Sequence, residues 1–214
     1  MRFDEAVRRL AELPDPLPDG AAELIPIILG ADGARRPRPS WPTGERPMRP
    51  AGVLVLLFPD DMGGARVVLT ERASRDGHHS GEVSFPGGKA EPHDVDIAAT
   101  ALREAAEEVG LDPVAAGVRV IGLLERFVIP VSDFDVTPVV AVASRRPVLV
   151  ASEAEVARIV EPPVTAFLPG APITIVERTI GAWPLRYGAF DVDGLSVWGA
   201  TARILSQLGA VLAR

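Results

Sequence analysis

The chain has 214 residues, of which 47% are hydrophobic and 24% charged, a balance typical of a folded globular protein rather than a disordered one. The net charge of −7 disfavours long nucleic acid as a partner, and the absence of cysteine excludes disulfides, thiolate metal sites and a cysteine nucleophile. No apolar run approaches the roughly 20 residues that span a bilayer, and the N-terminus lacks a signal-peptide core, so we expect a cytoplasmic protein without membrane contact.

The first part of the chain is expected to be a helix followed by an irregular arm. Apolar residues at helical spacing predict a short helix over residues 1–13. The prolines and arginines of residues 34–50 favour an extended segment, which either wraps around a compact domain or forms a partly disordered leader. We therefore divide the chain into an N-terminal helix and Pro/Arg-rich arm, residues 1–48, and a compact domain, residues 49–214.

The compact domain is expected to be a mixed β-sheet between helices. Apolar runs bounded by turn residues predict strands within residues 51–58, 65–72, 81–88, 118–129, 133–144, 172–180 and 185–199. Within the last of these, Asp193-Gly194 is typical of a hairpin turn. Helices are predicted over residues 94–109 and 199–212. This order of elements favours the α+β class, arranged as an α/β/α sandwich.

Three glutamates, Glu104, Glu107 and Glu108, crowd the end of the first of these two helices. At spacings of three and four residues their like charges destabilise a helix by a few tenths of a kcal/mol per pair. An apolar stripe falls on the other side, and Gly110 is a natural helix stop. A solvated acidic face is one explanation; the other is a site for a hard cation such as Mg²⁺, which favours carboxylate and phosphate oxygens.

The segment before this helix contains features that suit a phosphate ligand. Gly87 and Gly88 allow the backbone to approach a ligand closely, and Lys89 is within reach of a phosphate. Asp94 is expected as the N-cap of the helix or as an acid in its first turn. Strand, double-glycine loop and acidic helix therefore follow one another in the order that a phosphate and metal site requires.

This order of residues resembles the Nudix box of the Nudix hydrolases. The residues that fit the second half of the box in register are Arg103, Glu104, Glu107, Glu108, Gly110 and Leu111. Ala105 stands where a larger apolar residue is usual, and Asp94 stands where the box has glutamate. Arg103 follows Gly88 by fifteen residues, one more than the fourteen of the common box. The resemblance implies the Nudix fold and metal-dependent hydrolysis of a pyrophosphate P–O–P bond.

The longer box is similar to that of the coenzyme A pyrophosphatase branch of the family, which also has a signature before the box. The matching residues are Leu69, Thr70, Arg72, Ala73, His79, Gly81, Phe85, Pro86, Gly87 and Gly88. Gly77 stands where the branch usually has arginine, although Arg75 is close by, and residues 197–205 resemble the start of its C-terminal helix. The resemblance implies cleavage of coenzyme A to 3′,5′-ADP and 4′-phosphopantetheine.

The resemblance also implies roles for individual residues. Glu104, Glu107 and Glu108 would hold Mg²⁺ or Mn²⁺, with Arg103 orienting the glutamates by hydrogen bonds. Glu104, Arg103 and Glu107 are the residues expected to act in catalysis. Those expected to bind substrate are Arg72, Gly87, Gly88 and Lys89, with Arg72 at the 3′-phosphate or the pantetheine arm. The catalytic base is Glu104 or one of the downstream acids Glu125, Asp133 and Asp135.

Several alternatives remain open from the sequence. The box is also compatible with ADP-ribose, NADH or a nucleoside triphosphate as the substrate. A Nudix-fold module that senses a nucleotide without cutting it is the last-ranked of the three functions. Trp183, Tyr187 and Trp198 are candidates for stacking on adenine, although aromatic residues at such positions more often serve core or interface packing. His79 is a candidate for the substrate cleft. Members of the family often form dimers, so the resemblance leaves a homodimer open.

Overall fold

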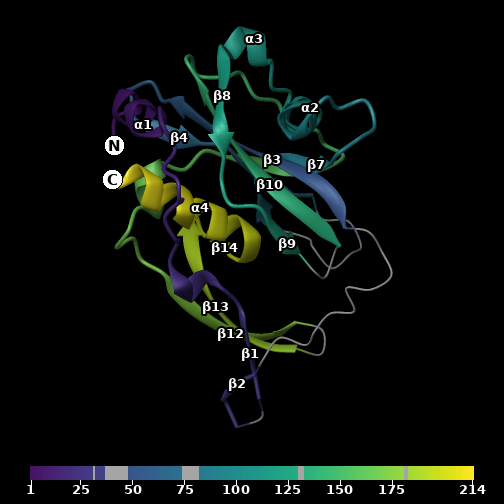
Figure 1. Cartoon of the computed structure of the whole chain (residues 1–214), viewed down its shortest axis with the longest axis vertical. Helices are drawn as coiled ribbons and strands as arrows, with labels where there is room; N and C mark the ends of the chain where they lie inside the picture. Colours follow the sequence, from purple (N-terminus) through teal and green to yellow (C-terminus); the bar gives the residue numbers. More distant parts are fainter. Residues whose placement is uncertain (31, 37–47, 74–81, 130–132, 181–182) are drawn as a thin grey trace.

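The computed structural model describes residues 1–30, 32–36, 48–73, 82–129, 133–180 and 183–214 (Figure 1). The helices there are α1 (Phe3–Leu10), α2 (Ile97–Val109), α3 (Pro113–Ala116) and α4 (Gly199–Leu212), with the 3-10 turns η1 (Ala22–Leu24) and η2 (Val164–Phe167). The strands are β1 (Ile27–Leu29), β2 (Arg35–Arg36), β3 (Arg49–Pro59), β4 (Ala65–Val67), β5 (Leu69–Arg72), β6 (Val83–Ser84), β7 (Gly87–Lys89), β8 (Val118–Leu123), β9 (Phe127–Ile129), β10 (Phe134–Ala143), β11 (Val156–Val160), β12 (Thr174–Ile180), β13 (Trp183–Val192) and β14 (Leu195–Val197). No helix in these segments is both long and apolar enough to span a membrane.

The central sheet is mixed, as predicted. Its strands lie in the order β4-β3-β10-β8, with β7 paired to β3 and β9 paired to β10. The long strands β3 and β10 run parallel, whereas β4, β7, β8 and β9 are antiparallel to their partners. The short β7 therefore lies beside the N-terminal half of β3, where Gly52 pairs with Gly88.

Alternating side chains of β3 build two separate cores on the two faces of this sheet. Leu54, Leu56 and Phe58 pack with α2, whereas Val55 and Leu57 pack with residues of α1 and α4. The alternation follows from the two-residue repeat of a strand, which sends successive side chains to opposite faces. Helices cover both faces in Figure 1, so the predicted α+β class and α/β/α sandwich are confirmed.

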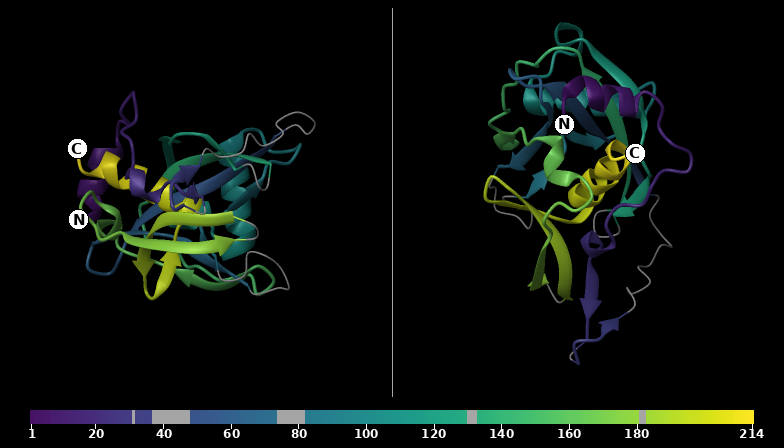
Figure 2. Two further views of the ribbon diagram at one scale, coloured as in Figure 1. Left: turned by 90° about the horizontal axis from the view of Figure 1, so that it is seen from below. Right: turned by 90° about the vertical axis from the view of Figure 1, so that its left-hand side faces the viewer.

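The N-terminal segment packs into the same body. Ala6 and Leu10 of α1 and Leu24 of η1 belong to the core on the α4 side. The two ends of the chain lie close together in Figure 2, and the Arg9 guanidinium donates a hydrogen bond to the carbonyl of Leu212. Further along, β1 pairs with β13 in a second sheet, of order β12-β13-β1-β2. The domain boundary near residue 48 stays a prediction.

Three of the predicted strands are each divided in two, and one of them, 118–129, forms β8 and β9. The segment 65–72 was expected to be one strand, but β4 pairs with β3 while β5 joins β6 and β11 in a third sheet. The segment 81–88 likewise forms β6 and β7, with Phe85 and Pro86 between them. The strand β11, which the sequence did not predict, pairs with β5. These assignments depend on partners distant in the sequence, which local patterns do not specify.

The helix starts, ends and turns follow the local sequence signals more closely. Gly110 ends α2 in the left-handed conformation, with φ of 63°, as expected. At the other end, α2 begins at Ile97 rather than residue 94, because the N-cap is Asp96, whose carboxylate accepts the Ala99 N–H at 2.8 Å. Asp94 is therefore neither the N-cap nor an acid of the first turn. The predicted Asp193-Gly194 hairpin joins β13 to β14.

Candidate active site

The glycine pair of β7 lies directly beneath α2. A Cβ added to Gly88 would lie 2.5–2.6 Å from the carboxylate atoms of Glu104, and one added to Gly87 would lie 2.4 Å from the carbonyl oxygen of Gly52. A Cβ at Gly87 would clash with the backbone of β3, so this position requires glycine, whereas a Cβ at Gly88 would displace the Glu104 carboxylate. The missing side chain at Gly88 is what allows the Glu104 carboxylate to lie against the strand.

Arg103 connects this helix to the loop before it. Its Nε and Nη2 atoms donate to the two carboxylate oxygens of Asp94 at 3.1 and 3.2 Å, and Nη2 also donates to the Lys89 carbonyl at 3.0 Å. Its Nη1 atom donates to Glu104 at 3.0 Å and to Glu107 at 3.3 Å. The guanidinium therefore hydrogen-bonds to two of the three box glutamates, Glu104 and Glu107, while its role in catalysis stays a prediction.

Asp94, in the loop before α2, is the carboxylate that holds the Arg103 guanidinium. Its carboxylate accepts hydrogen bonds from the Thr100 hydroxyl at 2.9 Å and from the Glu91 N–H at 2.8 Å, in addition to those from Arg103. The Arg103 guanidinium is the largest of several effects that hold the pKa of Asp94 far below its usual range. Asp94 is therefore ionised at neutral pH and fixes Arg103 in place.

Glu108 is the buried member of the glutamate cluster, with 6% of its surface exposed. Its Oε2 atom accepts the Gly87 N–H at 3.2 Å. Burial raises the pKa of the Glu108 carboxyl to about 7, against the opposing effects of the Gly87 hydrogen bond and the Arg72 charge, with Glu104 and Glu155 adding to the rise. A solvated acidic face is therefore excluded for Glu108, whose buried carboxylate forms no ion pair with any residue that the structure describes.

Glu104 and Glu107 differ in their exposure. The Glu104 side chain is 16% exposed and that of Glu107 is 59% exposed. Burial raises the pKa of Glu104, an effect that Arg103 opposes and that the charges of Glu107 and Glu155 increase. The mutual repulsion of these carboxylates is the kind of energetic cost that a divalent cation removes.

Glu155 is an acidic residue near the site that the sequence did not indicate. It lies just before β11, and its carbonyl accepts the Ala73 N–H at 2.9 Å. The same loop is bound to the end of α2, because the Ser152 N–H donates to the Glu108 carbonyl at 2.8 Å. The negative charge of Glu155 raises the pKa of both Glu104 and Glu108, after the larger effect of burial on each. Because Glu155 is distant from the box in the sequence, no local sequence pattern indicates that it belongs to the site.

The carboxylates are suitable ligands for a divalent cation, but their side chains do not form a complete coordination shell. Among the described residues, no three acidic or histidine side chains converge closely enough to hold a metal ion. The reason is visible in the contacts: Arg103 engages Glu104 and Glu107, while Glu108 is turned towards the Gly87 N–H. A donor set of one or two carboxylates completed by water and substrate phosphates is the arrangement that suits Mg²⁺.

The remaining sequence candidates lie apart or have other partners. Glu125 forms an ion pair with Arg203 at 3.0 Å, and Asp135 is bound to Arg126. Asp133 is a turn residue with φ of 54°, whose carbonyl accepts the Arg49 N–H. Of the substrate candidates, Arg72 and Lys89 are exposed. Residues Arg75, Gly77, His79 and Gly81 lie outside the described residues.

The three aromatic candidates do not form one platform. Tyr187 is buried and stacks on Trp198, with ring centroids 4.7 Å apart and an angle of 28° between the ring planes. This supports core packing as the explanation for both side chains. Trp183 is 40% exposed near the end of the β12–β13 hairpin.

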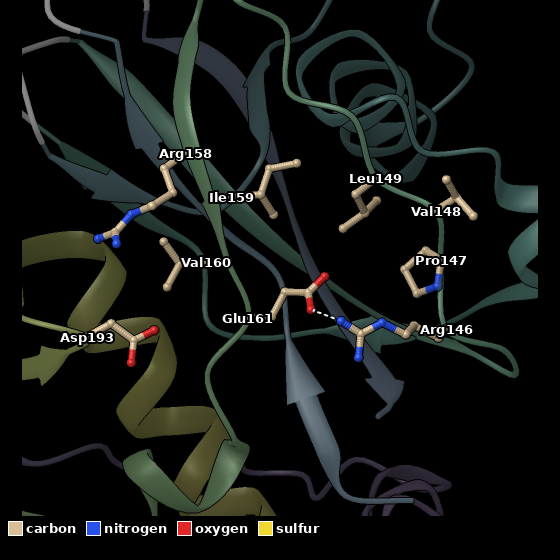
Figure 3. Close-up of a pocket in the computed structure, with 9 residues that line it drawn as sticks. All are labelled: Arg146, Pro147, Val148, Leu149, Arg158, Ile159, Val160, Glu161 and Asp193. Carbon is tan, nitrogen blue, oxygen red and sulfur yellow. Dashed lines mark hydrogen bonds and ion pairs between the residues drawn. The ribbon is translucent and has the colours of Figure 1, made fainter. Parts of the chain in front are cut away.

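A cavity of about 600 Å³ lies at the far end of β11 from Glu155 (Figure 3). It is lined by residues 146–149 and 158–161 together with Asp193. The ion pair of Arg146 with Glu161, 2.5 Å long, closes one side of it. None of the box glutamates lines this cavity, so its volume is separate from the site described above.

The chain belongs to the Nudix family, because the NUDIX domain matches residues 48–163. It is 40% identical over 178 residues to Nudix hydrolase 22, chloroplastic, of Arabidopsis thaliana, covering 80% of this chain and 57% of that protein. It is 38% identical over 165 residues to an uncharacterized Nudix hydrolase NudL of Enterobacter sp. (strain 638), covering 75% of this chain and 81% of that protein.

The chain spans somewhat more than half the length of two Arabidopsis relatives, 57% of Nudix hydrolase 22 and 58% of Nudix hydrolase 15, mitochondrial. Among solved structures, a MutT/nudix family protein from Enterococcus faecalis resembles it with a TM-score of 0.50 at 16% identity, covering 78% of this chain and 62% of that chain. This last likeness concerns the fold alone.

Proposed function

We propose that the chain is a metal-dependent pyrophosphohydrolase that cleaves coenzyme A or its derivatives to 3′,5′-ADP and 4′-phosphopantetheine or its acyl form. The observation that carries the hydrolase chemistry is the buried Glu108 carboxylate held against the Gly87 N–H, beside Glu104 and above the glycine pair. The choice of coenzyme A rests on the signature before the box, from Leu69 to Gly88.

In this proposal, Glu104, Glu107 and Glu108 would hold Mg²⁺ or Mn²⁺, and Glu155, whose charge acts on both Glu104 and Glu108, would be a further ligand. When bound, the cation supplies charge neutralisation at the pyrophosphate and a lowered pKa for an attached water. Arg103 holds the carboxylates in place, since phosphoryl chemistry depends on alignment and electrostatics more than on covalent help from the protein.

The remaining residues bind and orient the substrate. In the proposal, Gly87 and Gly88 lie next to the phosphate groups beside Glu104, and the exposed Lys89 pairs with these phosphates. The proton of the attacking water passes to a carboxylate of the site. Glu104, which lies against Gly88, and Glu155, whose charge acts on Glu108, suit this role better than Glu125 and Asp135, which bind arginines outside the glutamate cluster.

A substrate panel tests the proposal. Purified protein with Mg²⁺ or Mn²⁺ is incubated with coenzyme A, ADP-ribose, NADH and a nucleoside triphosphate, and the products are separated. The proposal predicts that coenzyme A is the best substrate. Rapid cleavage of another nucleotide with coenzyme A left intact would refute the substrate but not the chemistry. Binding without cleavage of any of them would favour a nucleotide sensor. The cytoplasmic location and a homodimer stay predictions.

A further inference from the structure

Arg72, the last residue of β5, lies between two segments that both contact Glu108. On one side its N–H donates to the Glu82 carbonyl at 3.0 Å, and the chain from Glu82 leads through β6 to Gly87, whose N–H binds the Glu108 carboxylate. On the other side Arg72 pairs with Val156 of β11, which follows the loop hydrogen-bonded to the Glu108 carbonyl. The backbone thus brings Arg72 to the buried end of the site.

The strand repeat also determines the side to which Arg72 points. Residues two apart on a strand share a face, so Arg72 lies on the same face as Thr70. Thr70 pairs with Ile159, and Ile159 packs against the core that α2 helps to build. Glu71 lies on the opposite face, where it binds Arg158 at 3.2 Å. Figure 3 shows Arg158 and Ile159 pointing to opposite sides of β11, as this alternation requires.

The exposure of Arg72 agrees with this placement. Among the described residues no ion pair of Arg72 is found, and the residue is exposed.

We propose that Arg72 binds the scissile pyrophosphate itself, rather than the 3′-phosphate or the pantetheine arm, and is a catalytic residue. The inference rests on the proposed function. In the reaction, the oxygen of water bonds to one phosphorus, the bridging P–O bond breaks, and its electron pair stays on the departing phosphate. A water proton goes to a carboxylate of the site. Arg72 keeps its own proton and stabilises the negative charge on the phosphate oxygens.

The test is steady-state kinetics of Arg72→Ala and Arg72→Lys on four substrates: coenzyme A, dephospho-coenzyme A, ADP-ribose and a nucleoside triphosphate. Dephospho-coenzyme A lacks the 3′-phosphate but keeps the pyrophosphate. Arg72→Ala is expected to lower kcat about 100-fold on each cleaved substrate, with a smaller change in KM, because one donor to developing charge typically contributes that much. Arg72→Lys keeps the positive charge but not the paired N–H donors of the guanidinium, so its kcat should fall less than that of Arg72→Ala.

Arg158→Ala is the matched control, since it removes an arginine from the same sheet on the opposite face and should leave kcat near the wild-type value. Circular dichroism confirms that each variant is folded. A loss confined to coenzyme A, with dephospho-coenzyme A cleaved normally, would assign Arg72 to the 3′-phosphate and overturn the inference, as would an unchanged kcat. If the wild type cleaves only ADP-ribose or the triphosphate, the coenzyme A proposal fails, while the role of Arg72 is still decided on the substrate that is cut.

Discussion

Replacing Glu108 by glutamine should stabilise the metal-free protein while abolishing its activity. Glu108 is 6% exposed, and burial raises its pKa from 4.5 to about 7. A carboxyl whose pKa is raised on folding contributes stability that is fully present below its unfolded pKa and is lost as the pH rises through the folded value. Glutamine is neutral at every pH and can still accept the Gly87 N–H, so it escapes this loss.

The expected gain in the free energy of unfolding follows from the same shift in the pKa of Glu108. A displacement of the pKa from 4.5 to about 7 corresponds to about 3 kcal/mol at pH 8 and about 1 kcal/mol at pH 5. In urea denaturation with EDTA, Glu108→Gln should therefore exceed the wild type in free energy of unfolding by more at pH 8 than at pH 5. Adding Mg²⁺ should stabilise the wild type and not the variant.

Glu107→Gln provides the matched comparison, because it removes a charge from the same helix at a side chain that is 59% exposed. Its effect on the free energy of unfolding should stay below about 1 kcal/mol at both pH values, as for other surface ion pairs. The reasoning is refuted if Glu108→Gln has the same pH dependence of stability as the wild type, or if it keeps near wild-type turnover with Mg²⁺.

Three further substitutions test the surroundings of the glutamates. Asp94→Asn should lower kcat by freeing Arg103. It should also remove part of the loss of stability at acid pH, because a carboxyl whose pKa is lowered on folding contributes stability that disappears as the pH falls through the folded pKa. Identical acid unfolding curves of variant and wild type would contradict this. Gly88→Ala places a Cβ 2.5 Å from a box carboxylate and should reduce kcat/KM at least 10-fold in a folded protein, measured with the best substrate. Glu155→Gln should weaken Mn²⁺ binding in calorimetry about 10-fold, whereas Glu153→Gln, which removes a charge from the same loop at a residue that is exposed like Glu155, should not.

The sequence predicted most of what local patterns control. Apolar spacing indicated α2 and α4, Gly110 indicated the end of α2, and Asp193-Gly194 indicated the last hairpin. These features depend on residues within a few positions of one another, so a single stretch of sequence contains the whole signal.

What the sequence did not predict depends on tertiary packing. Helical spacing grouped Glu108 with Glu104 and Glu107 on one polar face, but contact with β7 buries Glu108 and leaves Glu107 exposed. The charge of Glu155 acts on Glu104 and Glu108 because β11 pairs with β5 and the loop before β11 binds the end of α2. Asp94 was expected to cap the helix, yet its carboxylate binds Arg103 instead, because Asp96 takes the cap.

The most direct test of the account is product analysis after incubation with coenzyme A in ¹⁸O-labelled water. With Mg²⁺ or Mn²⁺, we predict 3′,5′-ADP and 4′-phosphopantetheine in equal amounts, with a single ¹⁸O atom in one of the two products and no reaction in EDTA. Coenzyme A that stays intact with either metal, or that is cut at any bond other than the pyrophosphate, would contradict the account.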